Sequence, residues 1–294
     1  MLLGSGWKAF KARVSGAPPD EAYALVTARG FRTGLSSGLD GLVAGPDDAL
    51  GLAIAGGLLV FMAQRARGWR DAEKTSRRRW QRHFELLEHA ADALTRSLRL
   101  DETSGLAAGF LARAAIHQDG EDVDVAEAAL ERARRPPAAA FVNLMVARTP
   151  KWGGSEHAMW KTARRWAAAA LPGSQAVIAR AHYEQWLQFA AFDEAPGARQ
   201  RAAAYWKSPE VMDDLITASD LALKATLPYG DRFNAHLADG WLGRVLVDAR
   251  QPTRAARHLR RLGGYADPEV WTIGMRFKPK TSLRLYRRSA GLLF

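Results

Sequence analysis

The chain has 294 residues, 48% of them hydrophobic, and is therefore long enough and apolar enough to bury a sizeable core. It contains no cysteine, which excludes disulfides, thiolate metal ligands and a cysteine nucleophile, and which is compatible with a reducing cytosol. The net charge of +11 favours anionic partners, and residues 251–294, with 10 Lys and Arg against 2 Asp and Glu, carry most of it.

Helical periodicity runs through most of the sequence. Apolar residues recur at spacings of three and four, whereas the sustained alternation typical of strands is absent. Residues 31–46 are expected to form a loop, Gly30 to end the helix before it, and Asp101 to cap a helix. The expected helices cover residues 7–14, 21–29, 49–63, 71–100, 102–116, 123–134, 136–148, 156–171, 175–192, 209–223, 232–248 and 253–262, with a short basic helix near the C-terminus. The sequence therefore predicts an all-α fold of antiparallel neighbours joined by short turns.

Two of these helices are expected to contribute strongly to the core. The run 49–63 is shorter than the roughly 18–20 apolar residues of a spanning helix, so we interpret it as buried rather than inserted in a membrane. The N-terminus lacks the pattern of a secretory signal, and we expect a cytoplasmic protein. In helix 71–100 the buried face is predicted to be the stripe Trp80, Phe84, Leu87, Ala91, Leu94 and Leu98.

A degenerate helical repeat is visible at 238–262. Positions of the tetratricopeptide pattern are filled there by Leu242, Gly243, Leu246, Ala255 and Leu259. Asp239 stands where that pattern has tryptophan, and looser pairs follow the same spacing at 104–134, 138–170 and 175–223. We therefore expect one helical-repeat domain over residues 1–294, an α-solenoid of antiparallel helix pairs. It would comprise N-terminal helices and a loop at 1–45, the repeat array at 46–264, and a basic tail and helix at 265–294.

The stretch KWGGSEHAMW at 151–160 combines two tryptophans, a glycine pair and Ser155, which is expected to cap the following helix. Together with PGS at 172–174, YWKSPEV at 205–211 and AARHLRRLGG at 255–264, it resembles a group of actinobacterial tetratricopeptide-like proteins of unknown function. The resemblance covers most of the chain, although Trp160 and Thr162 depart from the phenylalanine usual in the helix after the WGGS turn. It implies a helical-repeat fold and no established activity, cofactor or catalytic residue.

The usual catalytic and metal-binding patterns are absent from the sequence. The seven histidines form no His-x-x-x-His pair on one helical face, so no metal site or cofactor is predicted. No GxSxG elbow occurs, and the GGS at 153–155 lacks the lysine and the spacing of a phosphate-binding loop. The sequence therefore indicates no reaction class.

The strongest candidate for a small binding site is the helix that carries His182 and Trp186. These residues lie four apart and share a helical face. The alternative interpretation is that His182 is a hydrogen-bonded histidine of the core. A peptide or ligand groove is expected to include Lys151, Trp152, Asn143, His182, Trp186 and Asn234.

Two basic clusters are candidates for anion binding. Residues 65–82 hold eight Lys and Arg against two acids, interleaved with Trp69 and Trp80, so they form either a phosphate-binding surface or a solvated helix face. The C-terminal basic helix is expected to dock on the last repeat through its apolar side; the alternative is that it lies on an anionic membrane surface. The residues expected to contact phosphates are Arg77, Arg78, Arg79, Arg82, Arg287 and Arg288.

These observations favour a non-enzymatic adaptor that binds a protein or peptide, preferably an acidic one, in the groove of a helical-repeat array. A nucleic-acid-associated protein that uses the basic clusters is the first alternative. An enzyme or enzyme subunit of unrecognised chemistry is the second. The sequence leaves the oligomeric state open.

Overall fold

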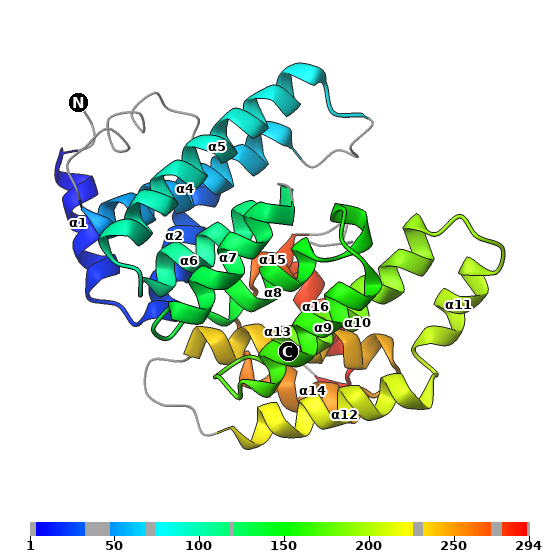
Figure 1. Cartoon of the computed structure of the whole chain (residues 1–294). Helices are drawn as coiled ribbons and strands as arrows, with labels where there is room; N and C mark the ends of the chain where they lie inside the picture. The colour runs from blue at the N-terminus through cyan, green and yellow to red at the C-terminus, as the bar shows by residue number, and fades with distance from the viewer. Residues whose placement is uncertain are drawn as a thin grey trace. The chain divides into compact units, whose positions relative to one another are not determined.

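The computed structural model describes residues 4–32, 48–68, 74–117, 120–225, 232–271 and 278–292 (Figure 1). Every regular element in these ranges is a helix, and the β contact found there is an isolated bridge between Ser104 and Arg134. The prediction of an all-α fold is therefore confirmed. The chain forms two compact units, Met1–Leu144 and Met145–Phe294, while the expectation of one repeat domain stays a prediction.

The N-terminal unit is arranged around one apolar helix, α4. The helices of this unit are α1 (Gly4–Ser15), α2 (Pro19–Arg32), α4 (Ala49–Arg67), α5 (Arg77–Leu100), α6 (Gly105–Ala114) with the 3₁₀ turn η2 (Ala115–His117), α7 (Gly120–Arg132) and most of α8 (Ala138–Ala147). Helix α4 contacts α1, α2, α5 and α6, and its residues 51–63 are all buried. A helix that is apolar on every side belongs in a core. Although α4 is long and apolar enough to cross a membrane, it is mostly buried inside the unit, which is compatible with a soluble protein.

Helices α4 and α5 lie side by side in opposite directions, and polar side chains of α5 fix their register (Figure 1). Near one end of the contact the Ser97 hydroxyl donates to the Ala49 carbonyl oxygen at 2.7 Å. Near the other end His83 Nδ1 lies 2.8 Å from the Ala63 carbonyl oxygen. Because both bonds join side chains to backbone carbonyls, a shift of α5 by one turn would break both.

Small residues let the two helices approach closely between these bonds. A Cβ added at Gly56 of α4 would lie 2.5 Å from Leu94 Cγ and 3.2 Å from the Ala90 carbonyl oxygen of α5. Ala90 and Ala93 are themselves fully buried. The contact therefore depends on the absence of a side chain at Gly56.

The predicted buried stripe of α5 is wrong at Phe84, which is 50% exposed. Trp80 is only partly buried as well. The residues of α5 that are buried are His83, Leu86, Leu87, Ala90, Ala93, Leu94 and Ser97. Because the alanines of α5 face the glycine of α4, the helix is rotated so that its large aromatic side chains lie away from the contact.

Two predicted helix boundaries are also wrong. Helix α2 continues past Gly30, where a Cβ would lie 2.7 Å from Phe61 Cβ, so this glycine allows close packing and does not end the helix. Asp101 lies at the end of α5 and accepts from Thr103, whereas Ser104 caps α6. Most of the predicted loop 31–46 and the predicted start of helix 71–100 lie outside the described residues.

The C-terminal unit is arranged around two buried helices, α10 and α13, which contact each other. Its elements are the end of α8, η3 (Pro150–Trp152), α9 (Glu156–Ala168), α10 (Ala176–Leu187), the π-helical turn η4 (Gln188–Phe192), α11 (Ala198–Tyr205), α12 (Pro209–Lys224), α13 (Arg232–Asp248), α14 (Pro252–Arg261), α15 (Pro268–Trp271) and α16 (Pro279–Ser289). Residues 176–185 of α10 and 234–246 of α13 are buried on every side. Helices α9, α12, α14 and α16 pack around this central pair.

The predicted contact between the two helices at 238–262 is confirmed. Helices α13 and α14 pack together, and a Cβ at Gly243 would lie 2.7 Å from Leu259 Cδ2. Leu242, Leu246 and Ala255 are fully buried at the same contact. Asp239, which replaces the tryptophan of the repeat pattern, is buried too and binds side chains of α14.

The substitution Gly56→Ala tests the close approach of α4 and α5. Alanine favours a helix over glycine, yet its methyl group would overlap Leu94, so we expect a loss of about 1–3 kcal/mol in the free energy of unfolding. Gly6→Ala is the control, because a Cβ at Gly6 meets no atom within 4 Å. Urea denaturation of both variants measures the difference, and equal stability of Gly56→Ala and the parent would contradict the packing argument.

Candidate functional site

The stretch at 151–160 forms a turn and a helix start, as predicted. Gly153 has a φ of +85°, a left-handed conformation that favours glycine, and a Cβ at Gly154 would lie 2.1 Å from the Arg148 carbonyl oxygen. Ser155 Oγ accepts from the Ala158 amide at 3.0 Å and caps α9. The glycines and the serine of this motif therefore have structural roles.

Lys151 belongs to a buried ion cluster with α10. Its Nζ lies 2.5 Å from one oxygen of Glu184, whose other oxygen accepts from Arg180. Burial by itself would raise the pKa of Glu184, but the charges of Arg180 and Lys151 hold that pKa below its ordinary value. Since Lys151 is already paired, its charge links η3 to α10. Its neighbour Trp152 is half-buried.

His182 lies in a second polar cluster, which joins four helices. Its Nδ1 is 2.9 Å from the Tyr205 hydroxyl, its Nε2 is 3.3 Å from Asp214 Oδ2, and its ring meets the edge of Trp160. Burial lowers the pKa of His182, although Asp214 opposes this effect. The contact with His182, together with Arg164, holds the pKa of Asp214 well below its ordinary value. These contacts fit the alternative of a hydrogen-bonded core histidine.

Trp186, one turn after His182, lines a cavity of about 850 Å³ within the C-terminal unit. The cavity is bounded by residues of α10, α11, α12, α13 and α16 and of the turns after α11 and α13. Its aromatic wall consists of Tyr183, Trp186, Trp206 and Tyr286, and its charged residues are Lys207, Arg244, Asp248 and Arg250. Neither His182 nor Lys151 lines this cavity, so the structure does not bring them together with Trp186 in it.

Arg244 is the buried cation of the cavity wall, with 2% of its surface exposed. Its guanidinium lies 4.3 Å from the ring centre of Tyr183, donates to the Tyr183 hydroxyl at 2.9 Å, and donates to the Val270 carbonyl oxygen. Guanidinium groups stack favourably on aromatic faces when they are desolvated. Arg244 therefore holds the aromatic wall in place.

Asp248 is the carboxylate of the same cavity. Burial raises its pKa to about 6, although the charge of Arg244 and a hydrogen bond from Tyr286, at 3.1 Å, oppose the rise. Burial and the nearby Asp248 charge in turn raise the pKa of Tyr286. A carboxyl group with a raised pKa in a cavity is a common feature of functional sites.

Arg250 adopts a strained backbone at the rim of the cavity. Its φ is +56°, and it ends α13 with the bond pattern of a Schellman cap, in which Gln251 N donates to the Leu246 carbonyl oxygen at 2.7 Å. Glycine is the residue that normally takes this position. An arginine in this conformation destabilises the folded protein by about 1 kcal/mol. Backbone strain of this kind is often found at functional sites.

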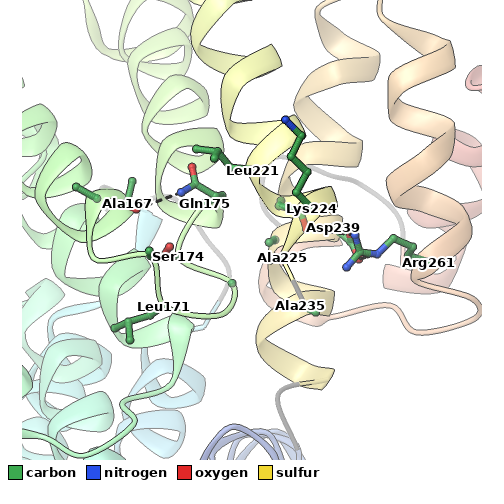
Figure 2. Close-up of a pocket in the computed structure, with 15 residues that line it drawn as sticks. Ala167, Leu171, Ser174, Gln175, Leu221, Lys224, Ala225, Ala235, Asp239 and Arg261 are labelled. Carbon is green, nitrogen blue, oxygen red and sulfur yellow. Dashed lines mark hydrogen bonds and ion pairs between the residues drawn. The ribbon is translucent and has the colours of Figure 1, made fainter. Parts of the chain in front are cut away.

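A smaller cavity, of about 500 Å³, lies between α9, α12 and α13, and Figure 2 shows its lining. Seven of its fifteen lining residues are alanines, and two of its charged residues, Asp239 and Arg261, are already paired, with Nε and Oδ2 3.1 Å apart. Residues 226–231, which connect two of its walls, lie outside the described residues. This cavity offers a ligand little specific chemistry.

Beside this smaller cavity, α12, α13 and α14 are joined by a serine, a histidine and an aspartate. His258 Nδ1 donates to Asp239 Oδ1 at 2.7 Å, and Ser219 Oγ lies 2.8 Å from His258 Nε2. Hydrolases use the same order of side chains. Ser219 and His258 are fully buried, however, and neither lines the cavity, so a substrate cannot reach the hydroxyl. We interpret the arrangement as a structural network.

The remaining predicted site residues lie elsewhere. Asn143 belongs to the N-terminal unit, where it donates to the Tyr23 hydroxyl and accepts from Arg113, and Asn234 is buried near the start of α13. The arginines Arg77, Arg78, Arg79 and Arg82 are exposed in the first turns of α5. In α16, Arg288 is exposed, whereas Arg287 donates to the Gly263 carbonyl oxygen.

Of the residues that line the larger cavity, only Trp186 is a binding residue predicted from the sequence. The others come from several helices that are distant in sequence, so no local motif unites them. One signal was available in the sequence. Arg244 and Asp248 are the only charged residues in the stretch 240–248, which is otherwise apolar, and they lie four residues apart.

The chain matches no known family model, no curated protein and no solved structure with which it was compared. The resemblance to actinobacterial tetratricopeptide-like proteins therefore stays a prediction.

The raised pKa of Asp248 predicts a pH-dependent stability. The folded protein holds this proton more tightly than the unfolded chain, so stability falls as pH rises from the ordinary carboxyl range through about 6. Asp248→Asn removes this penalty, and we expect a gain of about 2 kcal/mol near neutral pH that vanishes below about pH 4. Urea denaturation at the two pH values tests this, with Asp213→Asn on the exposed side of α12 as the control. A gain of equal size at both pH values would contradict the assignment.

The buried network predicts a large effect of Asp239→Ala. The change leaves His258 and Arg261 without their carboxylate, and we expect a loss of about 2–4 kcal/mol in the free energy of unfolding. Asp220→Ala, which breaks the partly exposed ion pair with Arg254, should have a much smaller effect. Thermal and urea denaturation give both values. Labelling of Ser219 in the folded protein by an active-serine probe would refute the structural interpretation.

Proposed function

We propose that the protein is a non-enzymatic, cytoplasmic binding module that holds an acidic peptide segment in the aromatic cavity of its C-terminal unit. The observation that carries the proposal is the combination of an aromatic wall with two exposed cations at the rim, Lys207 and Arg250. Tryptophan, tyrosine and arginine are the residues that most often dominate binding energy at protein interfaces. The volume, about 850 Å³, is in the range of ligand-binding cavities.

The charge of the cavity supports an acidic partner. Arg244 is occupied by Tyr183 and by the Val270 carbonyl, so the exposed cations available to a ligand are those of Lys207 and Arg250. Asp248, with a pKa of about 6, is largely ionised near neutral pH, but the three cations of the lining outnumber this single carboxylate. Carboxylates of a bound segment would therefore be attracted to the rim.

Two features of the cavity reduce stability, which supports a role in binding. Burial of Asp248 and the left-handed backbone at Arg250 both disfavour the folded state. Substitutions that relieve such destabilisation are common among possible mutations. A residue that destabilises the fold and is nevertheless present is therefore a candidate for a functional role. Both costs occur in the wall of the same cavity.

We further propose that α13 and α14 form a tetratricopeptide-like helix pair within an α-solenoid. The close approach at Gly243 and the complete burial of Leu242, Leu246 and Leu259 support this proposal. The acidic peptide segment would then bind beside the turn that joins α13 to α14.

Binding of fluorescein-labelled peptides tests the proposed function. The probe is a short Glu-rich peptide with one central tryptophan, compared with a Lys-rich peptide of the same length. We expect the acidic peptide to bind more tightly, and Trp186→Ala to weaken it at least about tenfold, because a buried aromatic anchor is lost. Fluorescence anisotropy gives both affinities. Equal binding of the acidic and basic peptides, or no effect of Trp186→Ala, would exclude this site.

Two further variants separate charge from strain. Lys207→Glu should weaken the binding of the acidic peptide. The matched control is Lys224→Glu, at the smaller cavity, which should leave this binding unchanged. Arg250→Gly should leave the free energy of unfolding unchanged or raise it by up to about 1 kcal/mol. The same variant should bind the acidic peptide more weakly, because one rim cation is lost. A loss of stability in Arg250→Gly would show that the arginine serves the fold.

A further inference from the structure

The first turns of α5, in the N-terminal unit, carry a dense group of exposed arginines. Arg77, Arg78, Arg79 and Arg82 are all exposed. In the part of the chain that the structure describes, the first three form no ion pair, and Arg82 makes one exposed contact of 3.3 Å with Glu85. Exposed pairs of this kind are weak. The positive charge of this turn is therefore largely uncompensated.

An aromatic pair lies beside these arginines. The rings of Trp80 and Phe84 are stacked, with centres 5.5 Å apart and planes inclined by 18°. The Arg67 guanidinium, from the end of α4, lies 4.9 Å from the Trp80 ring centre and supports the inner ring. The outer ring, Phe84, is 50% exposed. The result is a supported planar surface that faces solvent.

Helical spacing places one of the arginines on the side of α5 that carries the rings. Arg77 and Phe84 are two turns apart and share one side of α5, with Trp80 between them. Arg78 and Arg82, four residues apart, lie on another side of the helix, roughly 100–140° around the axis from Arg77. A phosphate bound by Arg77 would lie about 10 Å along the axis from the Phe84 ring, so a base of the same strand could reach that ring. The other arginines add positive charge around the start of the helix.

We propose that the exposed start of α5, with Arg77 beside Phe84 on one side and Arg78, Arg79 and Arg82 around the helix, binds single-stranded nucleic acid. Arginines neutralise the phosphates, and an exposed aromatic ring stacks on a base, which is how single strands are bound without sequence readout. A duplex offers phosphates but keeps its bases stacked inside, so it can use only the arginines. This surface is in the N-terminal unit and is independent of the peptide cavity.

The observations favour a nucleic acid over an anionic membrane. Helices that lie on membranes need a broad apolar face to insert among the lipids. The apolar face of α5 is buried in the core, where Leu86, Leu87 and Leu94 lie. What α5 exposes near its start is a single stacked ring among cations, which suits one base better than a lipid surface.

Fluorescence anisotropy with the full chain tests the proposal. The probe is labelled oligothymidylate of about twelve nucleotides, as a single strand and as a duplex with oligoadenylate, between about 50 and 200 mM salt. We expect tighter binding of the single strand and a steep loss of affinity with salt. The triple variant Arg77→Ala, Arg78→Ala, Arg79→Ala should bind at least about tenfold more weakly at low salt, with a salt slope smaller by about 2.

The variant Phe84→Leu distinguishes stacking from apolar contact. It keeps an apolar side chain but loses the planar ring, so we expect at least about fivefold weaker single-strand binding with an unchanged salt slope. The control variant Arg257→Ala, Arg260→Ala, Arg284→Ala removes the same charge from exposed positions of the C-terminal unit and should bind within about twofold of the parent. Circular dichroism confirms that the variants fold.

Several outcomes would overturn the proposal. These are no binding of the single strand at low salt, unchanged binding by Phe84→Leu, or an equal loss in the control triple variant. Binding to phosphatidylserine vesicles that Phe84→Leu retains, without binding to oligothymidylate, would assign the surface to a membrane instead.

Discussion

The C-terminal unit depends on two arginines that cross between its buried helices. Arg180 of α10 stacks on Trp241 of α13 at 4.5 Å, and Arg244 of α13 stacks on Tyr183 of α10 at 4.3 Å. Buried charges destabilise a protein unless they are fully compensated. Here Glu184, which also pairs with Lys151, compensates the first arginine, and the Tyr183 hydroxyl and a backbone carbonyl accept hydrogen bonds from the second. The reciprocal stacking therefore fixes how α10 and α13 pack, and with it the position of every helix around them.

The same interaction shapes the larger cavity. Arg244 and Tyr183 belong both to the helix contact and to the cavity wall, so the aromatic surface is held by the core and not by exposed rim residues. Asp248 lies one turn beyond Arg244 and keeps a raised pKa because burial outweighs the opposing charge of the arginine. A preorganised wall lowers the entropic cost of binding, which is consistent with a peptide site at this position.

In the N-terminal unit the corresponding constraint is the close approach of α4 and α5. Gly56, Ala90 and Ala93 bring the two helices together, and the hydrogen bonds of His83 and Ser97 fix their register. Because α5 is rotated so that its alanines face α4, the aromatic rings of Trp80 and Phe84 lie at the edge of the core, near exposed arginines. The packing of small residues on one side of α5 thus creates the exposed surface on the other.

The sequence by itself determined the all-α fold, the burial of α4, the cap at Ser155, the turn at Gly153 and Gly154, and the α13–α14 contact at Gly243. Each depends on residues close in sequence, where helical spacing and backbone preferences act directly. Only the tertiary structure decided which face of α5 is buried, because periodicity locates large apolar side chains, whereas the helix contact selects small ones. It also decided the partners of Lys151, His182 and His258 and the residues that line the cavity with Trp186, since these contacts join helices distant in sequence and no local spacing encodes them.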